Sequence, residues 1–262
     1  MDLTQAKHAF ITGGASGIGL GLADALAARG VPVTIADIDA AELESVVASR
    51  GAKGSGRLRG QLLDVRDRES WALAKSEAEA ALGPVDLLFN NAGIMPDGKE
   101  LSDMPPESFD RVIAINLTGV FNGISAFGSG FRALGKGHIV NTASMSGMAA
   151  AHAGLGSYGP SKFAVVAMSE VLRDEMAPYG VGVSVLCPGY TATNLPRSTK
   201  RIGGAIVDAS IDVLESEVKP HHVAEMVLRG IAANRLYIIT HPERMAAVEQ
   251  RFANIRADCD AG

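Results

Sequence analysis

Short apolar runs alternate with amphipathic helical stretches along almost the whole chain, and this alternation constrains the fold more than any other feature. Strands that alternate with helices pair in parallel, because each helix carries the chain back to the edge where the previous strand began. The runs are apolar on both faces, which is typical of a sheet covered by helices on both sides. The sequence therefore predicts a doubly wound α/β fold, with a seven-stranded, mainly parallel sheet, in a single domain over residues 1–262.

The elements expected from this pattern are separated by short turns, without a proline-rich linker or a repeat. The expected strands are His8–Thr12, Val33–Ala36, Leu58–Leu63, Val85–Phe89, His138–Thr142, Gly182–Leu186 and Leu236–Ile239. The expected helices are Ile18–Arg29, Ala40–Ser49, Arg68–Leu82, Pro106–Ala133, Tyr158–Tyr179 and His221–Asn234.

Composition narrows the class of protein and its partners. A net charge of −5 leaves no basic excess for a nucleic acid or an anionic membrane surface. Cys187 and Cys259 are the only cysteines, so we expect no disulfide framework and a cytoplasmic location. Neither a signal peptide nor an apolar run of ~18 residues is evident, so no membrane span is expected. No cluster of metal ligands is visible around His221 and His222.

A glycine-rich loop follows the first expected strand and opens the first expected helix. It reads Thr12-Gly-Gly-Ala-Ser-Gly-Ile-Gly19. Glycines let backbone amides approach a pyrophosphate, and the helix N-terminus adds a favourable dipole. A tight turn that only packs helix against strand is the alternative, but strand, glycine loop and helix in this order are typical of dinucleotide binding.

Two acidic positions predict which dinucleotide is preferred. Asp37 ends the second expected strand, where a carboxylate accepts both ribose hydroxyls and repels a 2′-phosphate. No basic residue adjoins Asp37, so the sequence favours NAD over NADP. Asp64, followed by Val65 after the third strand, either presents a carboxylate to the adenine or starts the next helix.

Tyr158 and Lys162 are four residues apart in an expected helix, so they project from the same face. An ammonium group beside a phenol stabilises the phenolate and lowers the tyrosine pKa from near ~10. Such a phenol exchanges protons with an alcohol or carbonyl oxygen. The pair predicts acid–base chemistry next to the nucleotide site.

Taken together, these motifs resemble the short-chain dehydrogenase/reductase family over residues 7–240. The shared positions are Thr12-Gly13-x-x-x-Gly17-x-Gly19, Asn90-Asn91-Ala92-Gly93, Asn116, Ser144, Tyr158-x-x-x-Lys162 and Pro188-Gly189-x-x-x-Thr193. The resemblance implies a Rossmann fold and reversible hydride transfer between NAD and an alcohol or ketone.

The resemblance also implies a role for each matching position. Tyr158 is the implied acid–base, Lys162 lowers its pKa, Ser144 holds the substrate oxygen, and Asn116 holds a water that links Lys162 to solvent. The implied cofactor-binding residues are Gly13, Ser16, Gly17, Ile18, Gly19, Asp37, Asp64, Val65, Asn91, Ala92, Gly93, Tyr158, Lys162, Pro188, Gly189, Thr191 and Thr193.

Two positions depart from the family's pattern. Ser144 precedes Tyr158 by 14 positions, one more than is common in the family, so Ser146 is a rival for its role. Alignment of Asn141-Thr-Ala-Ser144 with the end of the strand favours Ser144. Thr191 stands where the family often has valine or isoleucine, which changes local polarity without removing a catalytic group.

The substrate is expected to be a hydrophobic or aromatic secondary alcohol. Its expected contacts are Met95, Met145, Tyr190 and Leu195, with residues 190–218 as a substrate lid. The Tyr237–Glu243 tail and the helix after it resemble bacterial dehydrogenases of lignin-derived aryl alcohols. The family also implies a homodimer or homotetramer. A carbonyl or ketoacyl reductase that uses NAD(P)H is the alternative function, and a non-catalytic nucleotide-binding regulator is a third.

Overall fold

A single seven-stranded sheet organises the computed structural model, which describes residues 1–51, 57–149, 153–191, 193, 195, 199–200 and 218–261. The strand order is β3-β2-β1-β4-β5-β6-β7, and every pairing in it is parallel. This confirms the predicted fold class. The strands are β1 (Ala9–Thr12), β2 (Val33–Asp37), β3 (Leu58–Leu62), β4 (Leu87–Asn90), β5 (His138–Thr142), β6 (Gly182–Cys187) and β7 (Tyr237–Ile239).

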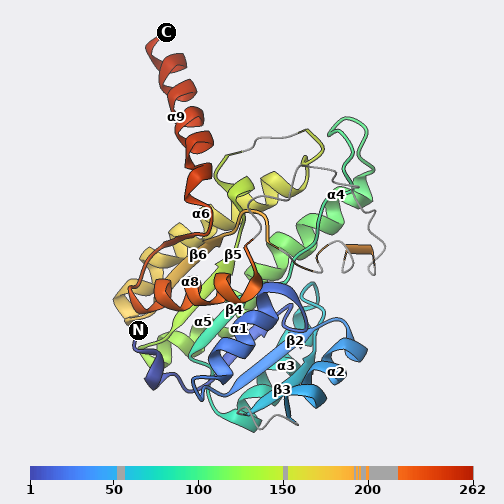
Figure 1. The fold of residues 1–262 in the computed structure, drawn as a ribbon, viewed down its shortest axis with the longest axis vertical. Helices are drawn as coiled ribbons and strands as arrows, with labels where there is room; N and C mark the ends of the chain where they lie inside the picture. Colours follow the sequence, from blue (N-terminus) through green and yellow to red (C-terminus); the bar gives the residue numbers. More distant parts are fainter. Residues whose placement is uncertain are drawn as a thin grey trace.

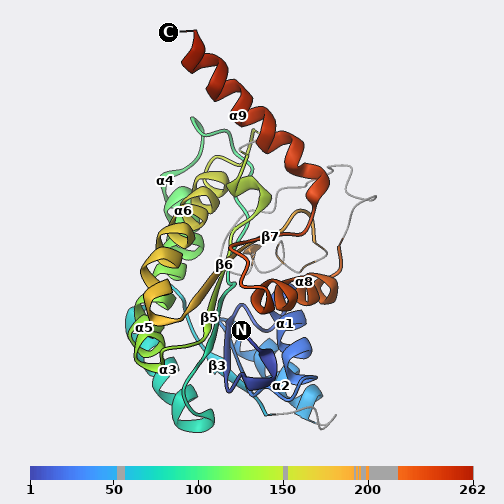
Figure 2. The same cartoon turned by 90° about the vertical axis from the view of Figure 1, so that its left-hand side faces the viewer.

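Helices cover both faces of the sheet (Figures 1 and 2). One apolar cluster joins the sheet to α1 (Gly17–Ala27), α2 (Ala40–Gly51) and α8 (Pro220–Ala232). A second cluster joins the opposite face to the other long helices. These are α3 (Arg68–Leu82), α4 (Pro106–Ile113), α5 (Gly119–Leu134) and α6 (Tyr158–Met176). The chain ends in α9 (Met245–Asp260), which extends away from both layers.

Short helices connect several of these elements. They are η1 (Leu3–Gln5), η3 (Met145–Gly147), η4 (Ala177–Tyr179) and η5 (Pro242–Arg244), all of the 3-10 type. A π-helical turn, η2 (Ala114–Thr118), joins α4 to α5, so residues 106–134 form one long helix. The sequence predicted the helix but not the π-helical turn within it.

The helix Pro106–Leu134 is long and apolar enough, by length and composition, to cross a membrane, contrary to the sequence-based expectation. Half of its most apolar window is buried inside the protein, where the helix packs between the sheet and its neighbours. A core helix of a sheet-covering layer passes the same test of hydropathy.

The strand order reverses direction between β1 and β4. From β1 the chain builds outward to β2 and β3, and then returns to place β4 on the other side of β1. In doubly wound sheets, a crevice opens at the carboxyl ends of the strands where this reversal occurs. The residues singled out from the sequence cluster at this edge of the sheet.

Candidate active site

The glycine loop lies between the end of β1 and the start of α1, and it depends on the absence of side chains. Gly13 and Gly17 have φ of +62° and +53°, in the left-handed region that favours glycine. A Cβ atom on Gly19 would lie 2.2 Å from the carbonyl oxygen of Gly13. The loop therefore keeps the N-terminus of α1 open towards a cleft, as an anion-binding loop requires.

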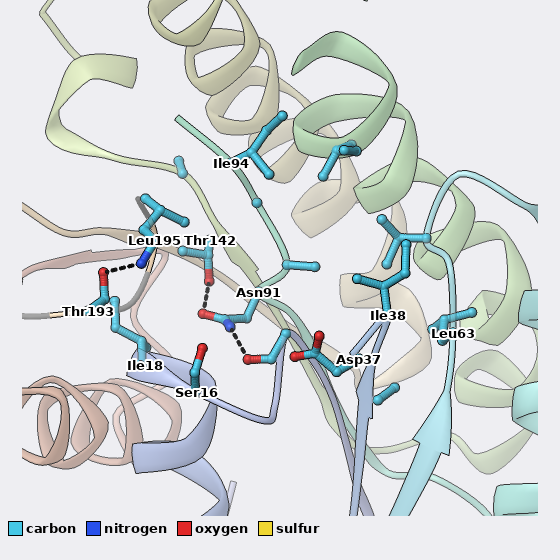
Figure 3. A pocket seen from close by; sticks show the side chains of 18 of the residues that line it. Ser16, Ile18, Asp37, Ile38, Leu63, Asn91, Ile94, Thr142, Thr193 and Leu195 are labelled. Carbon is cyan, nitrogen blue, oxygen red and sulfur yellow. Dashed lines mark hydrogen bonds between the residues drawn. The ribbon is translucent and has the colours of Figure 1, made fainter. Parts of the chain in front are cut away.

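Three strand ends are tied together at the floor of the cleft (Figure 3). The Thr12 hydroxyl oxygen accepts hydrogen bonds from the backbone N–H groups of Asn91 and Ala92, both at 3.0 Å. The Asn91 amide donates to the Thr12 carbonyl at 3.0 Å and accepts from the Thr142 hydroxyl at 3.4 Å. β1, β4 and β5 are thus held in register where the cleft opens.

Asp37 stands at the carboxyl end of β2, at one end of the cleft (Figure 3). One carboxylate oxygen accepts from the backbone N–H of Ala15 in the glycine loop, and the other from that of Asp39, each at 3.2 Å. Both bonds orient the carboxylate beside the glycine loop, where the sequence placed the ribose end of a dinucleotide.

Arg66 is a residue of the cleft that the sequence reasoning missed. It lines the cleft together with Asp64 and Val65, and its guanidinium contacts the Asp64 carboxylate at 2.5 Å. The hydrogen bonds from Arg66 lower the pKa of Asp64 below its ordinary value. The prediction from the sequence considered only the chain neighbours of Asp37. Arg66 follows β3, and because β3 pairs with β2, the fold brings this cation to the edge of the sheet where Asp37 lies.

Asn116 is fully buried inside the π-helical turn η2, and its side chain binds the backbone of the segment after β4. Its amide oxygen accepts from the Ile94 N–H at 2.8 Å, and its amide nitrogen donates to the Ile94 carbonyl at 3.0 Å. π-Helical turns occur mostly as single turns and frequently at functional sites. Here the turn aligns Asn116 with the loop that carries Gly93 and Ile94.

Tyr158 lines the cleft, and Ser144 is the residue whose side chain forms a hydrogen bond with it. Ser144 follows β5 and starts η3, and its side-chain oxygen also accepts from the Ser146 N–H at 3.1 Å. The hydrogen bond between the Ser144 and Tyr158 side chains lowers the pKa of Tyr158. The structure thus brings Ser144, rather than the rival Ser146, to the tyrosine hydroxyl.

Lys162 lies one helical turn after Tyr158 and is almost fully buried, with 3% exposure. Its ammonium donates to the Thr142 carbonyl at 2.9 Å and lies 5.6 Å from the centre of the Tyr158 ring. Burial lowers the pKa of Lys162 to about 8. The ammonium therefore still carries its charge at neutral pH.

The pKa of Tyr158 differs from the sequence-based expectation. Burial raises it above the ordinary 10.0, and the hydrogen bond with Ser144 opposes that rise. Lys162 was expected to lower this pKa, but its ammonium is engaged with the Thr142 carbonyl and sits over the ring. A phenol in this state is protonated at neutral pH.

The cleft joins nearly all the predicted cofactor residues. Those that line it are Gly13, Ser16, Gly17, Ile18, Asp37, Asp64, Val65, Asn91, Ala92, Gly93, Tyr158, Lys162, Pro188 and Thr193. Gly19, Gly189 and Thr191 lie outside its lining. Gly189 instead binds the segment after β7: its N–H donates to the Thr240 hydroxyl at 3.0 Å and to His241 Nδ1 at 3.2 Å.

The four expected substrate contacts are spread over different environments. Leu195 lines the cleft, whereas Met145 is buried in an apolar cluster with β6 and α6. Tyr190 is exposed, and Met95 donates its backbone N–H to the Thr199 hydroxyl at 2.9 Å. Much of the predicted lid, 192, 194, 196–198 and 201–217, lies outside the described residues.

No group of three or more histidine, cysteine, aspartate or glutamate side chains that could hold a metal ion occurs among the described residues. Cys187 is fully buried and free, and burial raises the pKa of its thiol to about 12. The ionisable side chains that line the cleft carry carboxylate, guanidinium, ammonium and phenol groups.

Comparison with known proteins identifies the family of this chain. Residues 7–201 match the short chain dehydrogenase family. A C alpha-dehydrogenase from a Sphingobium species is 35% identical over 265 residues, which cover 96% of this chain and 86% of that protein.

Solved structures show the same fold. A short chain dehydrogenase/reductase from Burkholderia phymatum in complex with NAD has a TM-score of 0.90 and 30% identity, covering 98% of this chain and 97% of that one. A short-chain dehydrogenase from Sphingobium yanoikuyae in complex with NADPH has a TM-score of 0.78 and 25% identity, covering 97% and 95%. The chain belongs to the short-chain dehydrogenase/reductase family and is an oxidoreductase that acts on CH–OH groups with a nicotinamide cofactor.

Proposed function

We propose that this protein is an NAD-dependent dehydrogenase that interconverts a hydrophobic or aromatic secondary alcohol and its ketone. The observation that carries the proposal is that Tyr158 and the buried Lys162, whose ammonium lies 5.6 Å from the tyrosine ring, line the same cleft as the glycine loop and Asp37. Because Tyr158, Lys162 and Asp37 all line this cleft, one dinucleotide bound there would contact both the acidic residue and the catalytic pair.

The cleft fits such a cofactor. The side-chain-free loop at the start of α1 would hold the pyrophosphate, and Asp37 would accept the ribose hydroxyls. Lys162 and Thr193 would hold the nicotinamide half. When bound, the nicotinamide supplies the acceptor for the hydride that leaves the carbinol carbon.

The side chains supply orientation and proton transfer. In the oxidative direction, the Ser144 hydroxyl would donate to the substrate oxygen while the phenolate form of Tyr158 would take the hydroxyl proton, so Tyr158 must first lose its own proton. The positive charge of Lys162, 5.6 Å from the centre of the tyrosine ring, would favour that phenolate against the effect of burial. In the reverse direction Tyr158 returns the proton to the oxygen of the ketone.

NAD is favoured over NADP because Asp37 is oriented by two backbone N–H groups beside the glycine loop. A 2′-phosphate in that position would meet a fixed negative charge. Arg66 could attract such a phosphate, but its guanidinium is engaged with Asp64. A relative solved with NAD supports the preference.

The substrate class rests on the cleft lining and on the relatives. Ile94, Ala143 and Leu195 add apolar surface to the cleft that Tyr158 also lines. The similar Sphingobium protein is a C alpha-dehydrogenase, and the Tyr237–Glu243 tail of this chain points to the same group. An aryl or alkyl secondary alcohol fits this lining better than a charged substrate.

Arg66 also favours a second candidate, a carbonyl reductase that uses NADPH. Should a 2′-phosphate displace Asp64 from Arg66, the cation would bind it, and one relative was solved with NADPH. The non-catalytic regulator has no comparable support, because Ser144, Tyr158 and Lys162 are brought together.

Fluorescence titration with NADH and NADPH separates these candidates, followed by a panel of secondary alcohols and ketones with the preferred cofactor. The proposal predicts tighter binding of NADH and oxidation of aryl alcohols. Tighter binding of NADPH with ketone reduction would establish the second candidate. Binding without turnover across the panel would contradict both in favour of a regulator.

A further inference from the structure

The C-terminal helix α9 leaves the body of the protein and extends into solvent (Figures 1 and 2). Val248 is its one buried residue, and every residue from Glu249 to Ala261 is exposed. Arg251 contacts the body as well, because its guanidinium lies 5.1 Å from the Phe163 ring of α6. Beyond this point α9 has no packing surface within its own chain among the described residues.

The apolar residues of α9 form a narrow stripe along the helix. They recur with alternating steps of three and four residues, as in a coiled-coil seam. The stripe consists of Met245, Val248, Phe252, Ile255 and Cys259. Met245 and Val248 pack on the body, whereas Phe252 and Ile255 are 60% and 45% exposed. The part of the seam without a partner is therefore the outer half of the helix.

An isolated helix of this length is marginal in water. The part of α9 beyond Val248, its last buried residue, is at the lower end of the ~12–15 residues below which an isolated helix gains most of its stability from packing of an apolar face. The opposite face is polar, with a hydrogen bond of 2.8 Å from Gln250 to Asn254. The seam, rather than the polar face, is the surface that requires an occupant.

Charge complementarity identifies the occupant as a second copy of α9. In an antiparallel pair with Phe252 of each copy against Ile255 of the other, Arg251 lies beside Asp258 of the second copy. The same register places Glu249 beside Arg256 of the second copy. None of these side chains forms an ion pair in the part of the chain that the structure describes.

A parallel pair is disfavoured by the same charges, because it would place Arg251 beside Arg256 of the second copy. The antiparallel arrangement also puts the two bodies at opposite ends of the paired helices. We propose that α9 is an interaction arm that pairs antiparallel with α9 of a second copy of this chain, through Phe252 and Ile255, with flanking Arg–Asp and Glu–Arg ion pairs.

Crosslinking tests this pairing better than molecular mass does, because two helices about 24 Å long bury less than the ~1,200 Å² of a stand-alone interface. In a Cys259→Ser background, Arg251→Cys with Asp258→Cys replaces one ion pair by two facing thiols. Within one helix these positions are two turns apart, too far for an intramolecular disulfide. The matched control, Gln250→Cys with Ala257→Cys, has the same spacing on the polar face.

At about 100 µM protein under mild oxidation, where so small an interface is still populated, the Arg251→Cys, Asp258→Cys variant is expected to form covalent dimers roughly a hundredfold faster than the control, because paired thiols have a high effective concentration. Adding Phe252→Asp and Ile255→Asp should slow it to the control rate. Equal rates for test and control variants would overturn the proposal.

The register has its own test. A mixture of the single variants Arg251→Cys and Asp258→Cys, each with Cys259→Ser, should yield mixed dimers in preference to either self-linked dimer. A preference for self-linked dimers would overturn the antiparallel register.

Discussion

At the scale of residues, Tyr158 and Lys162 show which properties of a side chain a sequence pattern predicts and which it does not. Helical spacing places both side chains on one face of α6, and this is found. Spacing does not determine side-chain rotamers or the depth of burial, and these set the pKa values. The lysine reaches the Thr142 carbonyl, and burial raises the pKa of the tyrosine.

Asp37 is the residue on which the cofactor preference depends. Asp37→Asn keeps an oxygen that can accept from the Ala15 N–H but removes the negative charge. We expect NADH to bind roughly tenfold more weakly, because charge-assisted hydrogen bonds to the ribose are lost, and NADPH to bind more tightly. Fluorescence titration with both cofactors measures the change in their ratio.

Asp39→Asn is the matched control, since Asp39 carries the same charge and accepts from the Glu42 N–H at the start of α2. It should leave the ratio of the two affinities unchanged. If Asp39→Asn and Asp37→Asn shift that ratio equally, the effect is one of net charge, and the assignment of Asp37 fails.

At the scale of elements, the sequence predicted every strand and most bounds within one or two residues. β5 and α3 have the predicted bounds, because their apolar pattern and flanking turns are sharp. The π-helical turn η2 had no signal in the sequence, since Asn116 and its neighbours also suit an ordinary helix. The hydrogen bonds between Asn116 and Ile94 depend on tertiary packing, which the helix propensity of the residues in the turn does not predict.

Asn116→Ala tests what this turn contributes. It leaves the buried N–H and carbonyl groups of Ile94 without their partners, which should cost about 1–3 kcal/mol in the free energy of unfolding. Because the loop carrying Gly93 then loosens beside Lys162, kcat at saturating cofactor should also fall. Urea denaturation and steady-state kinetics measure the two effects.

Asn122→Ala provides the comparison, because Asn122 is also buried and donates to the Val65 carbonyl at 3.0 Å from the next part of the same helix. It should lose similar stability and keep kcat. An equal loss of kcat in both variants would show that Asn116 has only a structural role.

β5 also contains a buried titratable group, His138. Burial lowers its pKa from 6.5 to about 3, and its Nε2 is 2.8 Å from the Ser184 hydroxyl. The folded protein keeps the ring neutral, whereas the unfolded chain binds a proton below pH 6.5. The neutral His138 ring therefore contributes its full share to the free energy of unfolding above pH 6.5, and this share is lost as the pH falls towards 3.

The expected loss from one such group is about 1.4 kcal/mol per pH unit. His138→Gln cannot titrate, so its unfolding free energy between pH 6 and pH 4 should fall less steeply than that of the unmodified protein. The slope against pH is the readout, so a uniform loss of stability does not matter. Identical slopes would show that His138 is protonated in the folded state as well.

At the scale of the whole molecule, the fold brings distant motifs to one edge of the sheet. The sequence predicted this edge correctly, because parallel strands place all their carboxyl ends together. It missed Arg66, which reaches the cleft only because β3 pairs with β2, and it did not separate Met145 in the core from Leu195 in the cleft. How deeply a side chain is buried depends on how the helices pack on the sheet. The hydrophobic pattern of the sequence does not specify that packing.

The central claim is that Tyr158 transfers the substrate proton in a cleft that holds the cofactor independently of it. The most direct measurement compares NADH binding and alcohol oxidation in Tyr158→Phe and in the unmodified protein. The phenylalanine keeps the ring but removes the hydroxyl that meets Ser144. We predict that NADH affinity stays within about twofold while turnover falls by at least ~10²–10⁴. Turnover retained near the unmodified level, with NADH still bound, would contradict the account.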